Sequence, residues 1–430
     1  MKRTILWIAL GLAVNLPVSA QLQLSQAQCR EMALKNNEEM RKATNSYQQA
    51  KLDKEIAFAA YLPELEGSLT GIYRKDMDMM EVELQMRGTY LAGITLNQPI
   101  FAGGKIIANN KLARIGVECA EESRRKTEMD IISEADNAYW TYVAVGEKVI
   151  LLEAYQKQLN ELHKQISKSV EVQMATKSDL LRIDTKRSQI LYQLTKAKNG
   201  VELCRMSLCS TLGIDIQTEI QATEKDMNIS APQRLEENIF TRPEYRLLVN
   251  QIEAQKQQIK VARADILPTF GISAQYSYYG NLKLVGQAED GSPFKQEYKE
   301  GSPMLMASVS IPLFRWGKSW KGIKKAKLDF QNAQLDLQRN ERLLTIELQQ
   351  AILNVTDGYN LIETANTGME QATENLRNMQ NNYDVSMCTL TDLLDAQAQW
   401  QESYSRQIEA KTQYKIYESE YMRVSGQLRP

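Results

Sequence analysis

The residues of this 430-residue chain that could do chemistry gather at two related turns. Thr176 and Asp179 stand three positions apart directly before a Leu-Leu pair, and Thr389 and Asp392 repeat this arrangement. The spacing is that of a capping box, in which a hydroxyl and a carboxylate bind the free N–H groups at the start of a helix. Asp395 lies beyond the second cap, where no helix start needs it. It is therefore the stronger candidate for a functional carboxylate.

The rest of the composition argues against catalysis. The single histidine, His163, makes a histidine-based metal or acid–base site improbable. The five cysteines are odd in number and share no metal-ligand spacing, so we interpret them as free or buried thiols. Neither a phosphate-binding loop nor a nucleophile elbow occurs, and a net charge of −1 gives no electrostatic basis for binding nucleic acid. We expect no enzyme, no cofactor and no bound metal.

Residues 1–20 have the pattern of a secretory signal peptide. Lys2 and Arg3 precede an apolar run from Ile5 to Leu16, and Val18-Ser19-Ala20 forms a small-residue cleavage site. The apolar run is too short to cross a bilayer as an anchor. We expect an exported protein that begins at Gln21 after cleavage.

The mature chain is predicted to consist of two tandem repeats, residues 21–213 and 214–430. The segment from Pro99 to Lys105 recurs as Pro312 to Lys318, with Pro, Phe, Gly and Lys at matching positions 213 residues apart. The Asp-Leu-Leu turns recur at the same distance. Each repeat opens with a helix, continues through a pair of strands and ends in a long helical hairpin.

Alternating apolar and polar residues predict a β-hairpin over residues 64–98 and another over 269–311, each around a polar loop. The strands are close to ten residues long and have aromatic residues at their ends, which favours tilted membrane strands over a small soluble sheet. The long charged loop over 280–302 suits an extracellular position. Four strands cannot close a barrel, so several copies must combine, and a trimer would supply twelve strands.

Two proline-free stretches predict very long helices, from about 105 to 172 and from about 318 to 385. Each would extend roughly 100 Å at about 1.5 Å per residue. Apolar residues spaced three and four apart indicate coiled-coil packing. Returning helices complete the helical hairpins 105–212 and 318–426, so the predicted fold class is mainly α with a small β part.

In this order and duplication, the motifs resemble the TolC-like outer-membrane efflux family over essentially the whole mature chain. The resemblance implies a homotrimer with a twelve-stranded barrel in the outer membrane lipid and an α-helical tunnel across the periplasm. It further implies a passive exit duct of a tripartite efflux or type I secretion system. The implied partners are a periplasmic adaptor (membrane fusion) protein and an inner-membrane pump of the RND or ABC type. The alternative is a periplasmic coiled-coil adaptor or structural protein without a pore.

The resemblance also assigns roles to the turn residues. Asp392 and Asp395 would form an acidic ring that constricts the pore, and Asp179 would pair with Tyr383 to lock the tips, next to the capping Thr176 and Thr389. The adaptor would dock on Val172, Gln173, Val385 and Ser386. Two departures stand out: Cys388 occupies a position where some members have a locking Arg, and Gln173 and Ser386 replace the usual tip glycines.

Overall fold

The structure is a computed structural model that describes residues 22–75, 77–79, 82–85, 87–224, 227–232, 235–287 and 292–429. The predicted signal peptide, residues 1–20, lies outside the described residues. The chain divides into two compact units, each assembled from separate segments. The helical unit contains residues up to Lys42, 126–241 and those from Leu344 onward, and the strand unit contains 43–125 and 242–343. Helices α3 (Lys105–Glu171) and α6 (Lys318–Asp384), of 67 residues each, run from one unit into the other.

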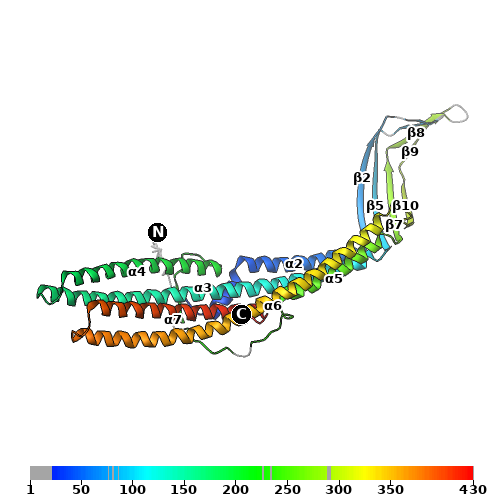
Figure 1. Ribbon diagram of the computed structural model, residues 1–430. Helices are drawn as coiled ribbons and strands as arrows, with labels where there is room; N and C mark the ends of the chain where they lie inside the picture. The colour runs from blue at the N-terminus through cyan, green and yellow to red at the C-terminus, as the bar shows by residue number, and fades with distance from the viewer. Residues whose placement is uncertain are drawn as a thin grey trace, which may run out of the picture. The chain divides into compact units, whose positions relative to one another are not determined.

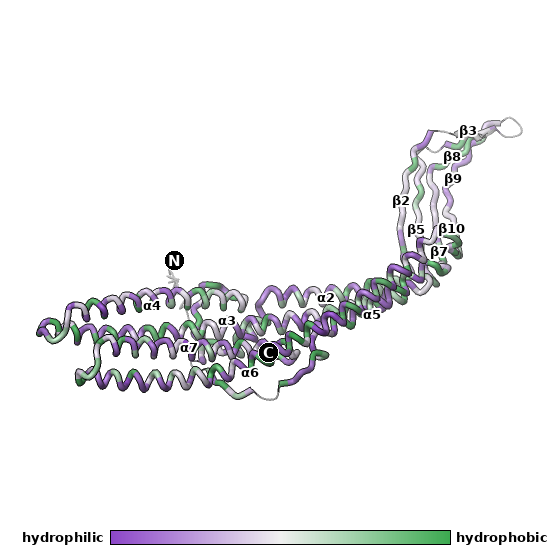
Figure 2. The backbone as a smooth tube through the Cα atoms, viewed as in Figure 1, coloured by the Kyte–Doolittle hydropathy of each residue, from purple (hydrophilic) through white to green (hydrophobic). Residues whose placement is uncertain are grey.

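The helical unit is built on two helical hairpins. Helix α3 is followed by α4 (Lys177–Thr211), and α6 by α7 (Leu390–Val424) (Figure 1). Near the hairpin ends, Ile166, Ile183 and Leu393 from three of these helices are buried in one cluster. Polar and apolar residues are interspersed along every one of these helices, as Figure 2 shows, because each helix buries only a narrow stripe.

A short N-terminal segment closes the other end of this unit. Strand β1 (Leu22–Leu24) pairs in parallel with β6 (Ile220–Ala222), and helix α1 (Gln26–Asn36) follows with a capping box of its own at Ser25. Beneath them the Asp136 carboxylate of α3 is fully buried and accepts two hydrogen bonds of 2.7 Å from the Arg30 guanidinium. Ser419 of α7 donates a further bond of 2.6 Å to it. One buried charge therefore joins α1, α3 and α7.

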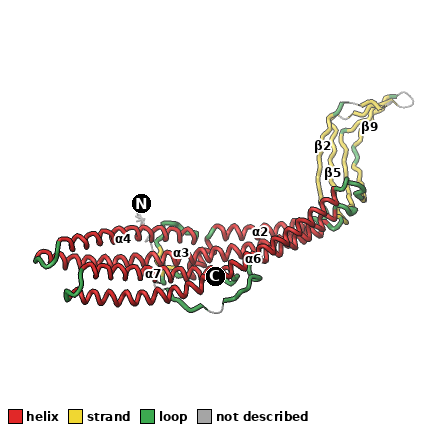
Figure 3. Tube along the Cα trace, in the orientation of Figure 1, coloured by secondary structure: helices red, strands yellow, loops and turns green. Residues whose placement is uncertain are grey.

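The strand unit contains an antiparallel sheet in the order β10-β7-β5-β2. Its strands are β2 (Glu64–Tyr73), β5 (Arg87–Ala102), β7 (Thr269–Gly280) and β10 (Gly301–Ser310) (Figure 3). Helix α2 (Glu38–Ala59), which enters the strand unit at residue 43, leads into β2, and α5 (Pro243–Ala264) leads into β7. The central pair β5–β7 joins the two halves of the sequence, so the predicted hairpins form one continuous sheet.

The segments expected to be polar loops contain four more strands. These are β3 (Met77–Met79), β4 (Val82–Gln85), β8 (Leu282–Gln287) and β9 (Pro293–Tyr298), in the order β3-β4-β8-β9. The loop expected over 280–302 therefore contains two strands that were not predicted. Pairing between β4 and β8 crosses from one half of the sequence to the other, and such a partner cannot be inferred from local composition.

The main sheet leaves apolar side chains and both of its edges uncovered in the single chain. Leu65 and Leu69 of β2 and Leu305 and Val309 of β10 are exposed. Strands β2 and β10 each pair on one side only. Unpaired backbone N–H and C=O groups at a sheet edge are unfavourable in hydrocarbon, and exposed leucines are unfavourable in water. We therefore expect strands of other copies to pair with the two edges of this sheet. Within the described ranges, no helix combines the length and the apolarity needed to cross a bilayer.

Candidate functional site

The hairpin tips end α3 and α6 with the same backbone turn. Met174 N–H donates to Ser169 O at 2.7 Å and Gln173 N–H to Val170 O at 3.1 Å, the two bonds of a Schellman motif. Met387 and Ser386 make the equivalent bonds at the second tip. The motif requires a left-handed residue, and Gln173 and Ser386 adopt φ values of 61° and 63°. The turn geometry that glycine would give is therefore formed without glycine.

The helices that leave these turns begin with the two predicted capping boxes. Asp392 Oδ2 accepts hydrogen bonds from Thr389 N at 2.9 Å and Thr389 Oγ1 at 2.6 Å, and Asp392 N–H donates back to Thr389 Oγ1. Thr176 and Asp179 form the same set at the start of α4. The hydrogen bonds from the Thr389 side chain, and then from its backbone, hold the pKa of Asp392 below its ordinary value.

Asp395 is placed differently from the two capping carboxylates. It is exposed one turn along α7, and among the described residues its side chain has no hydrogen bond or ion pair. The residue at the matching position of the first hairpin is Arg182, whose Nη1 donates to Thr391 Oγ1 across the two hairpins. Asp395 is thus a carboxylate with no structural task within one chain.

A groove of about 650 Å³ lies between the two tips and is lined by residues of both, among them Asp179, Arg182, Tyr383 and Cys388. Burial, and after it the nearby charge of Asp179, raises the pKa of Tyr383. No hydrogen bond joins these two side chains in the part of the chain that the structure describes; Oδ2 of Asp179 accepts instead from Thr176 Oγ1 at 2.6 Å. The Cys388 thiol donates to Met379 O at 3.5 Å.

The outermost surface of each tip is apolar. Val172 and Val385 are exposed, and Met174 and Met387 are 84% and 78% exposed. The Val-x-Met sequence is the same at both tips. Sequence reasoning missed the two methionines, although they coincide at the repeat distance of 213 residues and could have been found by that signal.

Comparison with known proteins decides the family. The profile of the family described as "Outer membrane efflux protein" matches residues 29–208 and 242–427. The chain belongs to the outer membrane efflux protein family. The family places it in the outer membrane, with its helical part in the periplasm.

Two relatives illustrate the distance within the family. The chain is 22% identical over 284 residues to the outer membrane efflux protein BepC of Brucella suis biovar 1. That match covers 66% of this chain and 59% of BepC, so it spans less than two thirds of the relative. The chain is also 22% identical over 388 residues to the probable efflux pump outer membrane protein TtgC of Pseudomonas putida, covering 85% of this chain and 75% of TtgC.

Solved structures of family members share the fold. The CmeC outer membrane channel of Campylobacter jejuni aligns with a TM-score of 0.75 at 17% identity, over 93% of this chain and 85% of CmeC. The outer membrane protein VceC of Vibrio cholerae aligns with a TM-score of 0.77 at 15% identity, over 93% of this chain and 96% of VceC. The predicted fold of long helical hairpins with a small β part is confirmed.

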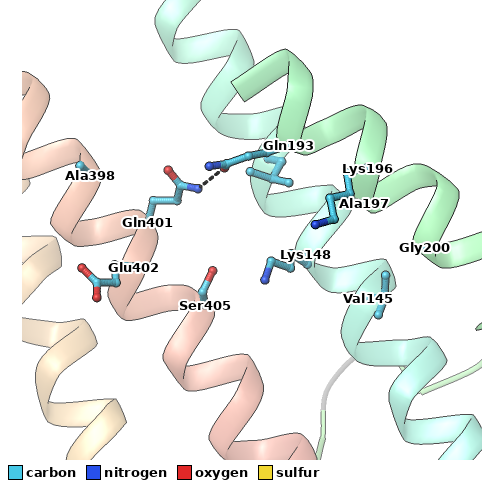
Figure 4. A pocket seen from close by; sticks show the side chains of 11 residues that line it. Val145, Lys148, Gln193, Lys196, Ala197, Gly200, Ala398, Gln401, Glu402 and Ser405 are labelled. Atoms are coloured by element: carbon cyan, nitrogen blue, oxygen red, sulfur yellow. Dashed lines mark hydrogen bonds between the residues drawn. The ribbon is translucent and has the colours of Figure 1, made fainter. Parts of the chain in front are cut away.

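A second groove, of about 540 Å³, lies further along the hairpins and was not predicted. Its walls come from α3, α4 and α7 and include Val145, Lys148, Gln193, Gln401 and Ser405. Figure 4 shows Gln193 and Gln401 directed toward each other across it, joined by a hydrogen bond of 3.0 Å. This amide pair joins α4 of the first hairpin to α7 of the second.

Proposed function

We propose that three copies of this chain form a passive exit duct in the outer membrane, through which substrates leave from a periplasmic adaptor and an inner-membrane pump. One observation carries the proposal: the sheet β10-β7-β5-β2 has two unpaired edges and exposed leucines in a chain of this family. Pairing β10 of each copy with β2 of the next would satisfy every edge and give twelve strands.

Asp392 and Asp395 form the constriction in this proposal. In a trimer they give six carboxylates at the periplasmic end of the tunnel. The lowered pKa of Asp392 is consistent with an ionised carboxylate at neutral pH, and Asp395 is exposed with no partner among the residues that the structure describes. A narrow ring of negative charge would attract cations and be blocked by hydrated divalent ions.

The tips are the docking surface for the adaptor. Val172, Gln173, Val385 and Ser386 lie on the two Schellman turns, and the exposed Met174 and Met387 extend the apolar surface. Methionine side chains adapt to differently shaped partners, which suits a contact made by two unequal hairpins. The pump that the adaptor serves would be of the RND or ABC type.

Conductance of single channels in planar bilayers tests the constriction. Replacing Asp392 and Asp395 by Ala should raise the conductance and reduce block by divalent cations, because charge and bulk are both removed from the ring. The Asp→Asn pair serves as a control that removes the charge and keeps the size. Unchanged conductance and unchanged block would exclude these residues from the constriction. A soluble periplasmic monomer on fractionation would contradict the duct itself.

A further inference from the structure

We propose that the segment joining β10 to α6, together with the first turns of α6, binds anionic phospholipid headgroups at the periplasmic face of the outer membrane. The segment, here called the basic collar, comprises residues 311–327 with Arg315, Lys318, Lys321, Lys324, Lys325 and Lys327. The inference rests on the proposed barrel, since it requires β10 to cross the membrane. It adds a lipid partner that the duct function does not need.

All charged residues of the basic collar are positive. No acidic residue occurs between Glu300 and Asp329, while six basic residues do. All six basic side chains are exposed, and none forms an ion pair with any residue that the structure describes. In the matching stretch of the first half, by contrast, two of the three basic residues are paired: Lys105 with Asp265 at 3.5 Å and Arg114 with Glu118 at 3.4 Å. Three copies of the collar would make a ring of eighteen positive charges.

The collar also exposes large apolar side chains among these charges. Leu313 is 90% exposed, Trp316 is 86% exposed, and Phe314 and Trp320 are exposed as well. The rings of Phe314 and Trp316 meet edge to face at 5.0 Å. Tryptophan beside lysine is the combination that lies at the boundary between headgroups and acyl chains, because the indole is apolar with one polar N–H.

The backbone at Trp316 carries strain. Trp316 has φ of 49°, in the left-handed region that a bulky side chain disfavours. The matching residue of the first half is Gly103, which adopts φ of 62° without such a cost. The same turn can therefore be made by glycine. A tryptophan held here in a strained conformation and pointing into solvent indicates a task for its side chain.

The position of the collar identifies the occupant as a lipid surface. β10 ends at Ser310, and α6 begins at Lys318 and continues into the periplasmic helices. Residues 311–317 therefore lie where a membrane strand leaves the bilayer. A free phosphate ion could pair with the lysines but offers no apolar surface to Leu313 and Trp316, and the place of these residues at the end of a membrane strand favours a lipid surface over an acidic protein.

Trp316 and Trp320 allow the lipid next to the collar to be measured directly. The mature chain is reconstituted into phosphatidylcholine vesicles with increasing amounts of brominated phosphatidylglycerol or, separately, brominated phosphatidylcholine. The collar signal is the quenchable fluorescence that disappears when Trp316 and Trp320 are both replaced by Phe. Its quenching gives the relative association of the two lipids.

The natural chain should favour the anionic lipid by about tenfold, because exposed basic side chains close to a bilayer surface attract anionic headgroups. Changing Lys318, Lys321, Lys324 and Lys325 together to Gln should bring that ratio close to one. The matched control changes four exposed lysines of the helical hairpins to Gln, namely Lys157, Lys168, Lys177 and Lys196, and should keep the preference.

The outcomes separate the collar from the duct. Equal quenching by both lipids in the natural chain, or a preference that survives the collar variant, overturns the lipid inference while leaving the barrel intact. Absence of quenching by either lipid in protein that floats with the vesicles also overturns the lipid inference, whereas protein that does not float with the vesicles contradicts the barrel and with it the proposed function. If the natural chain shows no lipid preference but binds peptidoglycan fragments, and the collar variant loses that binding, the charges serve that polymer and the lipid inference is wrong.

Discussion

At the scale of single residues, the tips use unfavourable backbone positions. Gln173 and Ser386 are left-handed in Schellman turns whose counterparts at the far ends of α4 and α7 use Gly213 and Gly426. A left-handed residue other than glycine costs about 1–2 kcal/mol, whereas glycine adds about 0.5–1 kcal/mol of unfolded-state entropy. Gln173 and Ser386 therefore make the folded chain slightly less stable than glycine would at the same positions.

Replacing Gln173 or Ser386 by Gly should raise the free energy of unfolding by about 0.5–1 kcal/mol per site, because the strain is removed. Urea unfolding in detergent, followed by circular dichroism, measures this. Gly213→Ala is the opposite control: its φ is 65°, and the added Cβ would come within 2.8 Å of the Asn36 carbonyl carbon. It should destabilise the protein, and a loss of stability in both tip variants would contradict the strain argument.

The pH dependence of the second cap follows from Asp392. Its pKa in the folded chain lies below the ordinary 3.8, because Thr389 hydrogen bonds stabilise the carboxylate. The stabilisation is therefore fully present above pH 3.8 and is lost as the pH falls through the lowered pKa. The difference in melting temperature between the natural chain and Asp392→Asn should be constant from pH 7 to 5 and shrink as the pH falls below 3.8 through the lowered pKa. Asp395→Asn, outside the cap, should show no such trend.

The capping residues of the tips could be predicted from the sequence, whereas the other contacts and the left-handed positions could not. The capping boxes are local, since Thr and Asp three positions apart supply both partners, and the sequence was enough to predict them. The contact between Asp179 and Tyr383 is not local, and whether it locks the tips depends on the neighbouring copies. The left-handed Gln173 and Ser386 carry no local signal, because neither residue type favours that conformation.

At the scale of elements, the buried Asp136 holds three helices together. Its carboxylate binds Arg30 of α1 and Ser419 of α7, and Gln26 of α1 adds a bond of 2.9 Å. Removing one partner of a buried ion pair leaves the other charge uncompensated, at a cost of about 3 kcal/mol or more. The spacing of apolar residues predicted the helices. The position of Asp136 on a mostly apolar stripe of α3 did not indicate that Arg30 and Ser419 bind it, because both lie far away in the sequence.

Asp136→Asn should therefore lower the free energy of unfolding by about 3 kcal/mol and loosen α1. Limited proteolysis in the segment from Ser25 to Asn37 should become faster, since Arg30 loses half of its anchor. The exposed pair Lys42–Glu39 provides the matched control, and Lys42→Gln should leave both measurements unchanged. Equal protease resistance in the natural chain and Asp136→Asn would show that apolar contacts alone hold α1.

At the scale of the whole molecule, the compact units do not follow the predicted repeats. Each unit draws segments from both 21–213 and 214–430. The sheet is the physical reason in the strand unit, because β5 and β7 come from different repeats and form its centre. In the helical unit, α7 of the second repeat packs on α3 and α4 of the first. A repeat boundary in sequence is therefore no guide to which residues unfold together.

The proposed assembly depends on how the sheet edges of separate copies pair. Joining β10 of one chain to β2 of another is a head-to-tail contact, and such contacts either close into a ring or continue into a filament. Cross-linking distinguishes the two. A cysteine at Leu305 of β10 is combined with one cysteine moved along residues 65–70 of β2, with the five native cysteines replaced by Ala.

Alternate β2 positions should cross-link strongly, because successive side chains of a strand point to opposite faces. The product should stop at the mass of three chains, since a closed ring leaves no free edge to continue from. A cysteine pair at Leu69 and Ala92, which are partners within the sheet, should link without any increase in mass. A ladder that extends beyond three chains, or linking at every position alike, would contradict a closed twelve-stranded barrel with a fixed strand register.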